Sequence, residues 1–149
     1  MLRYRRTKHT VFMLSLFMLA AVVLSACGQT SPTPSEGEGV KGGGGSYRDI
    51  TPAQLASMRE NKDFLLVNVH IPYGGELPDT DLFVPFNEIE QNLSRFPANK
   101  EAQIVVYCRS GPMSAAAAGT LVSLGFTNVW DLDGGMRQWE SQGYELIHK

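Results

Sequence analysis

Short apolar runs alternate with longer segments of mixed polarity in the C-terminal two thirds of the chain. Three such runs, at residues 64–69, 104–107 and 128–132, are rich in Val, Ile and Leu. Runs of this length and composition are typical of strands that are buried on both faces of a sheet. The pattern therefore predicts three core strands at these positions.

The segments around these runs carry the signals of helix starts and stops. Thr51, Pro52 and Gln54 supply an N-cap, a proline at the first helical position and a glutamine three residues after the cap. Gly125 and Gly143 stand where a glycine commonly ends a helix. The helices predicted in this way cover residues 52–60, 87–93, 114–124 and 136–142.

The order of these elements indicates the fold class. Strands that alternate with helices form a mostly parallel sheet, because each crossover helix returns the chain to the same edge of the sheet. The sequence predicts an α/β fold in three layers, with a mostly parallel central sheet flanked by helices.

The first 26 residues have the composition of an export signal. Four basic residues precede an uncharged apolar run at 11–24, which is shorter than the roughly 20 residues of a membrane-spanning helix. The tetrad Leu-Ser-Ala-Cys at 24–27 resembles a bacterial lipobox, in which the cysteine is lipidated and becomes the new N-terminus. We expect residues 1–26 to be a signal peptide and Cys27 to be lipidated. The protein would then be an exported lipoprotein, anchored in a membrane on the extracytoplasmic side.

Residues 27–46 have the composition of a flexible linker. They are almost all Ser, Pro, Thr, Gly, Glu and Lys, and they end in four glycines and a serine. Such a segment buries too little apolar surface to order itself. We expect it to tether a single folded domain at residues 47–149.

Charge and cysteine usage narrow the possible partners. Loss of the four basic residues before the apolar run leaves nine basic and 15 acidic residues, a formal charge of −6. This balance argues against a nucleic-acid partner. Once Cys27 is acylated, Cys108 is the remaining cysteine, so it has no partner for an internal disulfide.

Cys108 lies where chemistry is expected in an open parallel sheet. It follows the predicted strand at 104–107 and precedes a short turn that contains Gly111 and leads into the alanine-rich helix. Backbone N–H groups at a helix N-terminus face outward and carry partial positive charge. They would favour a thiolate over a thiol and would stabilise a persulfide anion on the same sulfur.

Several motifs together resemble the rhodanese family. They are Cys-Arg-Ser-Gly at 108–111, Leu-Gly-Phe-Thr-Asn-Val at 124–129 after the alanine-rich helix, and Leu-Asp-Gly-Gly at 132–135 with Trp139 four residues on. The resemblance covers residues 47–148. It implies an α/β fold and a double-displacement transfer of sulfur through a cysteine persulfide, with Cys108 at the family's catalytic position.

The length and composition of the loop separate sulfur transfer from other cysteine chemistry. Phosphatases and arsenate reductases related to this fold resemble Cys-x5-Arg, whereas position 114 here is serine. The mature domain has no Cys-x-x-Cys pair, which argues against a thioredoxin-like reaction. Arg109 is the cation that the sequence places beside the thiol. The residues that we expect to line the substrate site are His70, Arg109, Ser110, Gly111, Pro112, Met113 and Ser114.

The first core strand departs from the family pattern. Many rhodaneses end this strand with a sequence like Asp-Val-Arg, but here it reads Asn68-Val-His70. Either His70 lines the site at the edge of the sheet, or it is a strand-end histidine without a chemical role. The acidic side chains in the following loop, 72–81, match no metal-ligand spacing, so we expect no metal. The loop remains a candidate gate for access to Cys108.

Two functions follow from these residues. The first is a sulfurtransferase that needs no cofactor and moves sulfane sulfur from a small donor, of thiosulfate or persulfide type, to a thiol or cyanide-like acceptor. The alternative is a non-catalytic module of the same fold that binds a partner or senses sulfur or oxidants through Cys108.

In loops of this kind a second basic residue often follows the glycine, whereas here Gly111 is followed by Pro112.

Overall fold

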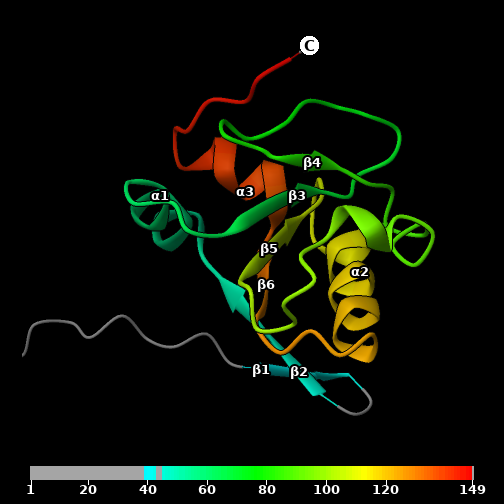
Figure 1. Ribbon diagram of the computed structural model, residues 1–149. Helices are drawn as coiled ribbons and strands as arrows, with labels where there is room; N and C mark the ends of the chain where they lie inside the picture. Colours follow the sequence, from blue (N-terminus) through cyan, green and yellow to red (C-terminus); the bar gives the residue numbers. More distant parts are fainter. Residues whose placement is uncertain (1–38, 43–44, 149) are drawn as a thin grey trace, which may run out of the picture. The chain divides into compact units, whose positions relative to one another are not determined.

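The structure is a computed structural model that describes residues 39–42 and 45–148 (Figure 1). The predicted signal peptide and the lipidated Cys27 lie outside the described residues. Within these two described ranges, no helix is long and apolar enough to cross a membrane.

Six strands form one sheet with the spatial order β1-β2-β6-β5-β3-β4. All neighbouring strands pair in parallel except β1 and β2, which are antiparallel. The strands are β1 (Gly39–Gly42), β2 (Gly45–Ile50), β3 (Leu65–Asn68), β4 (Leu82–Phe83), β5 (Ile104–Tyr107) and β6 (Val129–Leu132). The sheet therefore includes residues 39–42 and 45–46, which the sequence analysis assigned to the linker.

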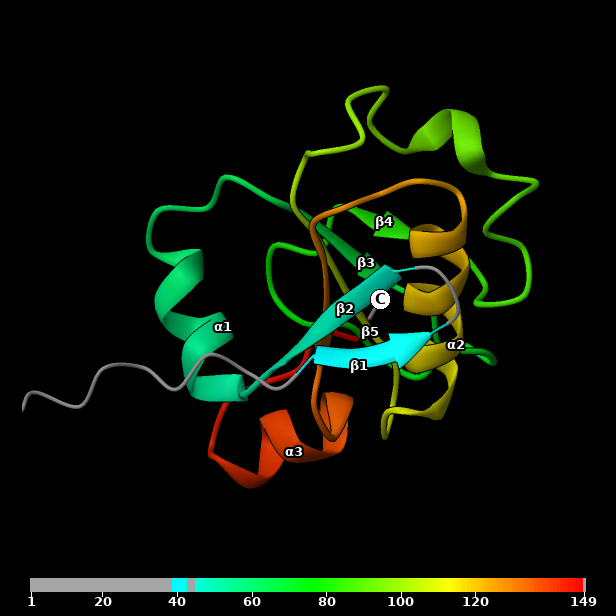
Figure 2. The same cartoon turned by 90° about the horizontal axis from the view of Figure 1, so that it is seen from below.

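Helices cover both faces of the sheet, as the sequence predicted. The helices are α1 (Pro52–Arg59), α2 (Pro112–Ser123) and α3 (Gly135–Ser141), with a 3₁₀ helix η1 (Leu93–Arg95). Figure 2 shows α2 on one side of the sheet and α1 and α3 on the other. A hydrophobic core lies on each face of the sheet, because successive side chains of a strand point to opposite faces. Val106 packs in the core on the α2 side, whereas Val105 packs with Leu55 of α1 and Trp139 of α3. The three-layer α/β fold is confirmed.

Local sequence explains why the main elements form where they do. The Thr51 hydroxyl accepts a hydrogen bond from Gln54 N at 3.2 Å, and the Gln54 side chain accepts one from Thr51 N at 2.8 Å, which completes the predicted capping box of α1. Helix α2 begins two residues earlier than predicted, because Pro112 has a backbone torsion suited to the first helical position and lacks an N–H that would need a partner.

The helix predicted at residues 87–93 is wrong. The chain there forms turns followed by η1, with hydrogen bonds mostly between residues three apart, such as Leu93 N to the Glu90 carbonyl at 3.3 Å, and one bond between residues four apart, Asn92 N to the Glu88 carbonyl at 3.1 Å. Only two side chains between 87 and 96 are buried, Ile89 and Phe96, and they are seven residues apart. This segment therefore has no continuous apolar stripe to hold a longer helix against the core.

Candidate functional site

Cys108 follows β5 directly, at the carboxyl edge of the parallel strands. Its side chain is 1% exposed, and its Sγ accepts a hydrogen bond from Gly111 N at 3.1 Å. Gly111 has a φ of 109°, a conformation that side-chain-bearing residues rarely adopt. The glycine therefore allows the turn to point an amide back at the sulfur, as the sequence predicted for this loop.

The start of α3 supports the loop from outside. Met136 N donates to the Cys108 carbonyl at 2.9 Å, and Arg137 N donates to the Arg109 carbonyl at 3.0 Å. A Cβ on Gly135 would lie 2.2 Å from the Cys108 carbonyl oxygen, so only glycine fits at this contact. The two glycines at 134 and 135 thus serve both a tight turn and a close approach of two backbones.

The remaining loop residues divide into an exposed rim and a buried base. Arg109, Ser110 and Pro112 are exposed, and Met113 is half-buried against the core on the α2 side. Ser114 is fully buried, and its hydroxyl lies 3.5 Å from Cys108 Sγ and 2.9 Å from the Gly111 carbonyl. Two of the six predicted loop residues, Gly111 and Ser114, are therefore within hydrogen-bond distance of the sulfur.

His70 lies in the neighbourhood of Arg109. A Cβ on Gly74 would be 3.7 Å from His70 Nε2 and 3.9 Å from an Arg109 guanidinium nitrogen, so both side chains border Gly74. Burial, and secondarily the positive charge of Arg109, lowers the pKa of His70 below its ordinary value. A lowered pKa favours the neutral ring, so His70 adds little positive charge beside Arg109.

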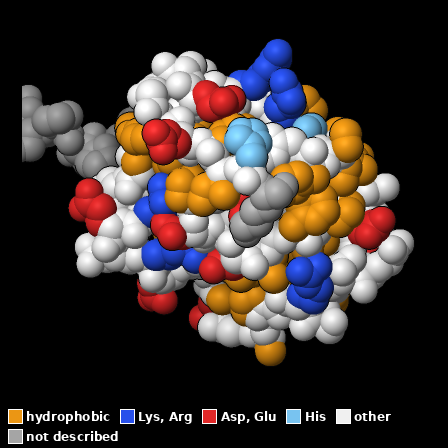
Figure 3. Space-filling view, turned by 90° about the horizontal axis from the view of Figure 1, so that it is seen from above, with side chains coloured by type: hydrophobic (Ala, Val, Ile, Leu, Met, Phe, Trp, Pro, Cys, Tyr) orange, Lys and Arg blue, Asp and Glu red, His pale blue; other side chains and the backbone are white. Residues whose placement is uncertain are grey.

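A cavity of about 160 Å³ opens beside Arg109. In the space-filling view of Figure 3, histidine side chains lie close to basic and apolar side chains on one face of the molecule. The cavity is lined by Gly74, Arg109, Met136, Glu140, Leu146 and His148.

The loop after β3 is fixed at several points. Asn68 donates through Nδ2 to the Gly75 carbonyl at 3.0 Å and accepts at Oδ1 from His70 N at 3.0 Å. Glu76 and Ile147 exchange two backbone hydrogen bonds, of 2.8 and 2.7 Å, which join the loop to the C-terminal segment. The neutral amide at position 68 thus has a structural role that a carboxylate could not fill, because it must donate as well as accept.

Tyr107, one residue before Cys108, is a further attachment of this loop. Its phenol oxygen accepts a hydrogen bond from Leu77 N at 3.0 Å and lies 2.7 Å from the Thr80 hydroxyl. Burial raises the pKa of Tyr107 above its ordinary range. The phenol therefore stays protonated and connects the loop to the strand that carries Cys108.

The sequence analysis missed one buried acid close to the site. Asp131 lies in the middle of β6, opposite Val106 of β5, and is 4% exposed. Burial and, after it, the nearby charges of Asp49 and Asp133 raise its pKa to about 7, although a hydrogen bond from Ser114 opposes the shift. A carboxyl group inside a strand that otherwise reads as core was the available signal.

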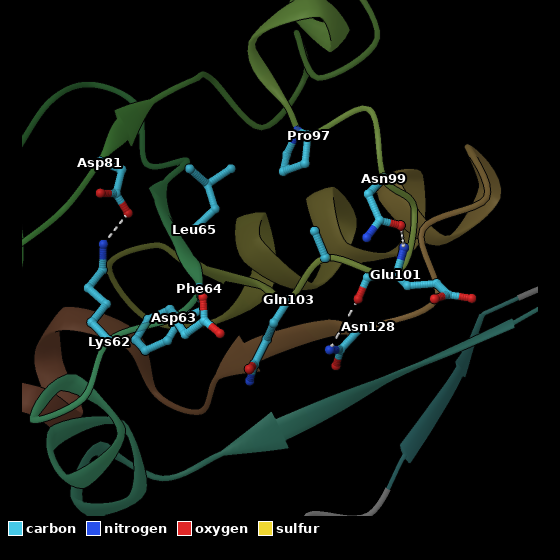
Figure 4. A pocket seen from close by; sticks show the side chains of 11 residues that line it. Lys62, Asp63, Phe64, Leu65, Asp81, Pro97, Asn99, Glu101, Gln103 and Asn128 are labelled. Carbon is cyan, nitrogen blue, oxygen red and sulfur yellow. Dashed lines mark hydrogen bonds and ion pairs between the residues drawn. The ribbon is translucent and has the colours of Figure 1, made fainter.

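A larger cleft lies at the opposite end of the sheet. Its volume is about 750 Å³, and Figure 4 shows mostly polar side chains around it, with Lys62 paired to Asp81. It borders the amino ends of β3 and β5, where Leu65 and Gln103 lie, whereas Cys108 follows the carboxyl end of β5. This cleft is therefore separate from the cysteine loop. No group of three or more His, Cys, Asp or Glu within residues 39–42 and 45–148 is arranged to hold a metal ion.

The fold and the loop define an α/β protein in which a cysteine, Cys108, lies at the carboxyl edge of the parallel strands. The profile of the Rhodanese-like domain matches residues 51–142, and the chain belongs to this family.

Named relatives and solved structures agree with this assignment. A sulfurtransferase of Allochromatium vinosum is 32% identical over 93 residues, which cover 60% of this chain and 84% of that protein. The thiosulfate sulfurtransferase GlpE of Pseudoalteromonas translucida is 26% identical over 109 residues, 70% of this chain and 99% of the relative. A rhodanese-like domain protein from Staphylococcus aureus superposes with a TM-score of 0.56 at 28% identity and covers 68% of this chain and 98% of its own.

Proposed function

We propose that the protein is a sulfurtransferase in which Cys108 carries sulfane sulfur as a persulfide. The observation that carries the proposal is the hydrogen bond from Gly111 N to the Sγ of Cys108, at the mouth of a loop whose backbone is fixed by α3. A fixed amide dipole aimed at sulfur stabilises negative charge there without reorganising during the reaction. Both resting forms of the cycle, thiolate and persulfide anion, carry that charge.

The first half-reaction loads the enzyme. The Cys108 thiolate attacks the outer sulfur of the donor, a new S–S bond forms, and the donor's own S–S bond breaks. The leaving group departs with the bonding electron pair, as sulfite from thiosulfate or as a thiolate from an organic persulfide. The negative charge then resides on the outer sulfur of the Cys108 persulfide.

The second half-reaction returns the enzyme to its starting state. A thiolate or cyanide acceptor attacks the outer sulfur, and Cys108 leaves as a thiolate with the electron pair. No net oxidation occurs, so no redox cofactor is required. Arg109 is an exposed cation one residue from Cys108, which supports a role in attracting anionic donors towards the loop.

The names of the relatives support this proposal at the level of reaction class. Several are named thiosulfate sulfurtransferases, and they span identities from 26 to 48% over aligned segments of different length. In this chain, Arg109 is the basic side chain of the loop between Cys108 and Ser114. We therefore propose persulfide-type donors of lower charge as the preferred class, with thiosulfate a poorer donor.

Intact-protein mass spectrometry tests the chemistry directly. The Cys27→Ala chain is incubated with thiosulfate or an organic persulfide, and we expect a mass gain of one sulfur atom that cyanide or a thiol removes. The matched control is the same chain with Cys108→Ala, which should gain none. If the parent chain gains no sulfur from either donor class, the enzymatic proposal fails.

The alternative function is a binding or sensing module. The support for it is the low exposure of Cys108, 1%, because a buried thiol reacts slowly with small donors. Multiple turnover separates the two functions. A sulfurtransferase releases many equivalents of transferred sulfur per chain, whereas a sensor stops after one. A single-equivalent burst without turnover, for all donors and acceptors tried, would favour the sensor.

We also propose that Cys27 anchors the domain to a membrane. The support is the order of basic residues, apolar run and Leu-Ser-Ala-Cys tetrad in the sequence. In the native bacterium, the Cys27→Ala chain should leave the membrane fraction while its soluble domain keeps the same thermal unfolding midpoint. Retention of a processed Cys27→Ala chain in the membrane would contradict the anchor.

A further inference from the structure

The cavity of about 160 Å³ beside Arg109 is formed by four segments that lie far apart in the sequence. These segments are the loop after β3, the cysteine loop, α3 and the C-terminal residues. They contribute Gly74, Arg109, Met136, Glu140, Leu146 and His148. Pockets for drug-sized ligands measure roughly 300–1,000 Å³. The cavity is smaller than these, so it suits a molecule of the size of a small amino acid.

Backbone contacts join two walls of this cavity. Glu76 and Ile147 exchange two backbone hydrogen bonds, of 2.8 and 2.7 Å, so the C-terminal segment follows the loop after β3 (Figure 1). A Cβ on Gly75 would lie 2.9 Å from Cε1 of His148, which places the His148 ring directly against the loop backbone. The C-terminal wall is therefore held in place by main-chain hydrogen bonds and by a close ring contact.

Two side chains of opposite charge line the cavity. Arg109 belongs to the cysteine loop, whereas Glu140 belongs to α3 and lies one turn after Met136 on the same face of that helix. Within residues 39–42 and 45–148, neither Arg109 nor Glu140 forms an ion pair. The guanidinium and the carboxylate thus border the same small space without neutralising each other.

A cation and an anion on either side of a gap are complementary to a zwitterion. A guanidinium pairs with a carboxylate, often through two parallel N–H···O bonds. A carboxylate in turn accepts hydrogen bonds from an ammonium group, which has three donors. Two other lining side chains, Met136 and Leu146, are apolar and do not compete for either charged group. An α-amino acid carries both charges on one carbon, so it presents them within the short span that such a cavity allows.

We propose that this cavity binds a small zwitterion of the α-amino-acid class, with the carboxylate of the ligand on Arg109 and its ammonium on Glu140. A short side chain, such as that of alanine or cysteine, then lies along Met136 and Leu146. The inference goes beyond the proposed function, because binding requires no sulfur chemistry and the lining does not include Cys108. The site adjoins the cysteine loop, since Arg109 belongs to both and Met136 N donates to the Cys108 carbonyl.

Three probes with the same side chain separate the two charges of the ligand. They are S-methyl-L-cysteine, its N-acetyl derivative, which lacks the ammonium, and its methyl ester, which lacks the carboxylate. Each probe is titrated into the Cys27→Ala chain at mildly acidic pH, where the amines are protonated, and the amide NMR shifts of the cavity residues are followed. We expect S-methyl-L-cysteine to bind with saturation. Each blocked probe should bind about ten-fold or more weakly, because it loses one charge-assisted hydrogen-bonded pair.

Two substitutions test which side chain holds which group. Glu140→Gln should weaken binding of S-methyl-L-cysteine about ten-fold but should not weaken binding of the N-acetyl probe, which has no ammonium. Arg109→Gln should weaken binding of S-methyl-L-cysteine and of the N-acetyl probe but not of the methyl ester. The matched controls are Glu145→Gln and Arg137→Gln, which remove the same charges from exposed side chains outside the cavity lining. Both control chains should bind all three probes as the parent does.

Three results would overturn the inference. The first is the absence of saturable shifts at the cavity residues of the parent chain, up to the solubility limit of S-methyl-L-cysteine. The second is equal affinity for all three probes. The third is an unchanged affinity of folded Glu140→Gln for S-methyl-L-cysteine, which would leave a simple anion site at Arg109. Cys108→Ala should bind S-methyl-L-cysteine as the parent does, so failure of the sulfurtransferase proposal would appear in the mass spectra and leave this binding unchanged.

Discussion

The amide of Met136 donates a hydrogen bond of 2.9 Å to the carbonyl of Cys108, so the first turn of α3 holds the backbone of the cysteine loop. This contact is possible because the preceding residue is Gly135, whose backbone lies directly against the Cys108 carbonyl. The position of the sulfur is therefore determined from two sides, by the turn ahead of α2 and by the start of α3.

Replacing Gly135 with alanine should displace the cysteine loop. The new Cβ would lie 2.2 Å from the Cys108 oxygen and 2.9 Å from the Arg109 carbonyl carbon, and neither backbone atom can move without the loop. We expect sulfur loading, measured by mass spectrometry, to slow by more than about ten-fold, since small displacements of a reacting group are costly.

Gly143→Ala is the control for backbone strain alone. Gly143 also has a positive φ, of 85°, but a Cβ added there would meet nothing within 4 Å beyond its chain neighbours. The change should lower stability by about 1 kcal/mol and leave loading unchanged. Equal loading by folded Gly135→Ala and Gly143→Ala would show that the contact with α3 is dispensable.

Asn68→Asp should destabilise the domain more as the pH rises. The aspartate keeps the acceptor for His70 N but, when ionised, faces the Gly75 carbonyl without a donor in a fully buried position. We expect a loss of about 1–3 kcal/mol in the free energy of unfolding at pH 7, measured with urea. Protonation restores an O–H donor, so the loss should shrink at acid pH.

Asn128→Asp is the matched control at the other end of the sheet. Asn128 is only half-buried and donates weakly, at 3.5 Å, to the Glu101 carbonyl. Its replacement should change the free energy of unfolding by less than about 1 kcal/mol at any pH tested. A similar loss of unfolding free energy in both variants would mean that the hydrogen bond to the Gly75 carbonyl does not contribute more to stability than the bond to the Glu101 carbonyl.

The raised pKa of Asp131 predicts a pH dependence of stability. The folded chain holds the proton up to about pH 7, whereas the unfolded chain releases it near pH 4, so the folded state binds more protons between these values. The contribution to stability is complete below about pH 4 and is lost as the pH rises through about 7. Between these limits the free energy of unfolding should fall by on the order of 2–4 kcal/mol.

Asp131→Asn provides the comparison, because an amide does not titrate. Its free energy of unfolding, from urea titrations at several pH values, should lack most of this decline, so the variant should gain relative to the parent as the pH rises from 4 to 8. Parallel curves for the two proteins would show that Asp131 ionises with an ordinary pKa.

A second positive charge in the loop should improve the use of thiosulfate. Pro112 is exposed at the start of α2, so Pro112→Arg adds a cation beside the rim without disturbing the core. A charge about 6 Å from a dianion in a water-like medium contributes on the order of 1 kcal/mol, or several-fold in kcat/KM. The gain should fade at high salt.

Pro112→Ala removes the proline without adding charge and isolates the electrostatic effect. Met113→Arg is a less clean variant than Pro112→Arg, because Met113 packs against the core on the α2 side. If thiosulfate kcat/KM is the same in Pro112→Arg and Pro112→Ala at low salt, the charge of the loop does not set the donor preference.

Sequence reasoning worked best where the signal is local. The strand at 104–107, Cys108 after it, and the glycine and proline before α2 are neighbours in the chain, and each has a conformational preference of its own. The sequence analysis missed strand β2, whose sequence is Gly-Ser-Tyr-Arg-Asp-Ile. This segment is mostly polar, and it forms a strand because it pairs with β6.

Contacts between distant segments could not be predicted in the same way. The role of Gly135 depends on the backbone of Cys108, and that of Asn68 on the carbonyl of Gly75, and neither partner is marked by composition. Asp131 stands inside a strand that otherwise reads as core, which was a signal, but its burial depends on neighbours across the sheet that the local sequence does not identify.

The larger cleft and the cysteine loop lie at opposite ends of the sheet. A peptide or a small domain can therefore be inserted near the cleft, away from Cys108. Glu60 and Asn61 are exposed in the turn that leads to the amino end of β3, close to the lining residue Lys62. A reporter peptide or fluorescent module inserted there extends into solvent from the end that the cysteine loop does not occupy. Sulfur transfer and the inserted reporter could then be engineered independently within one chain.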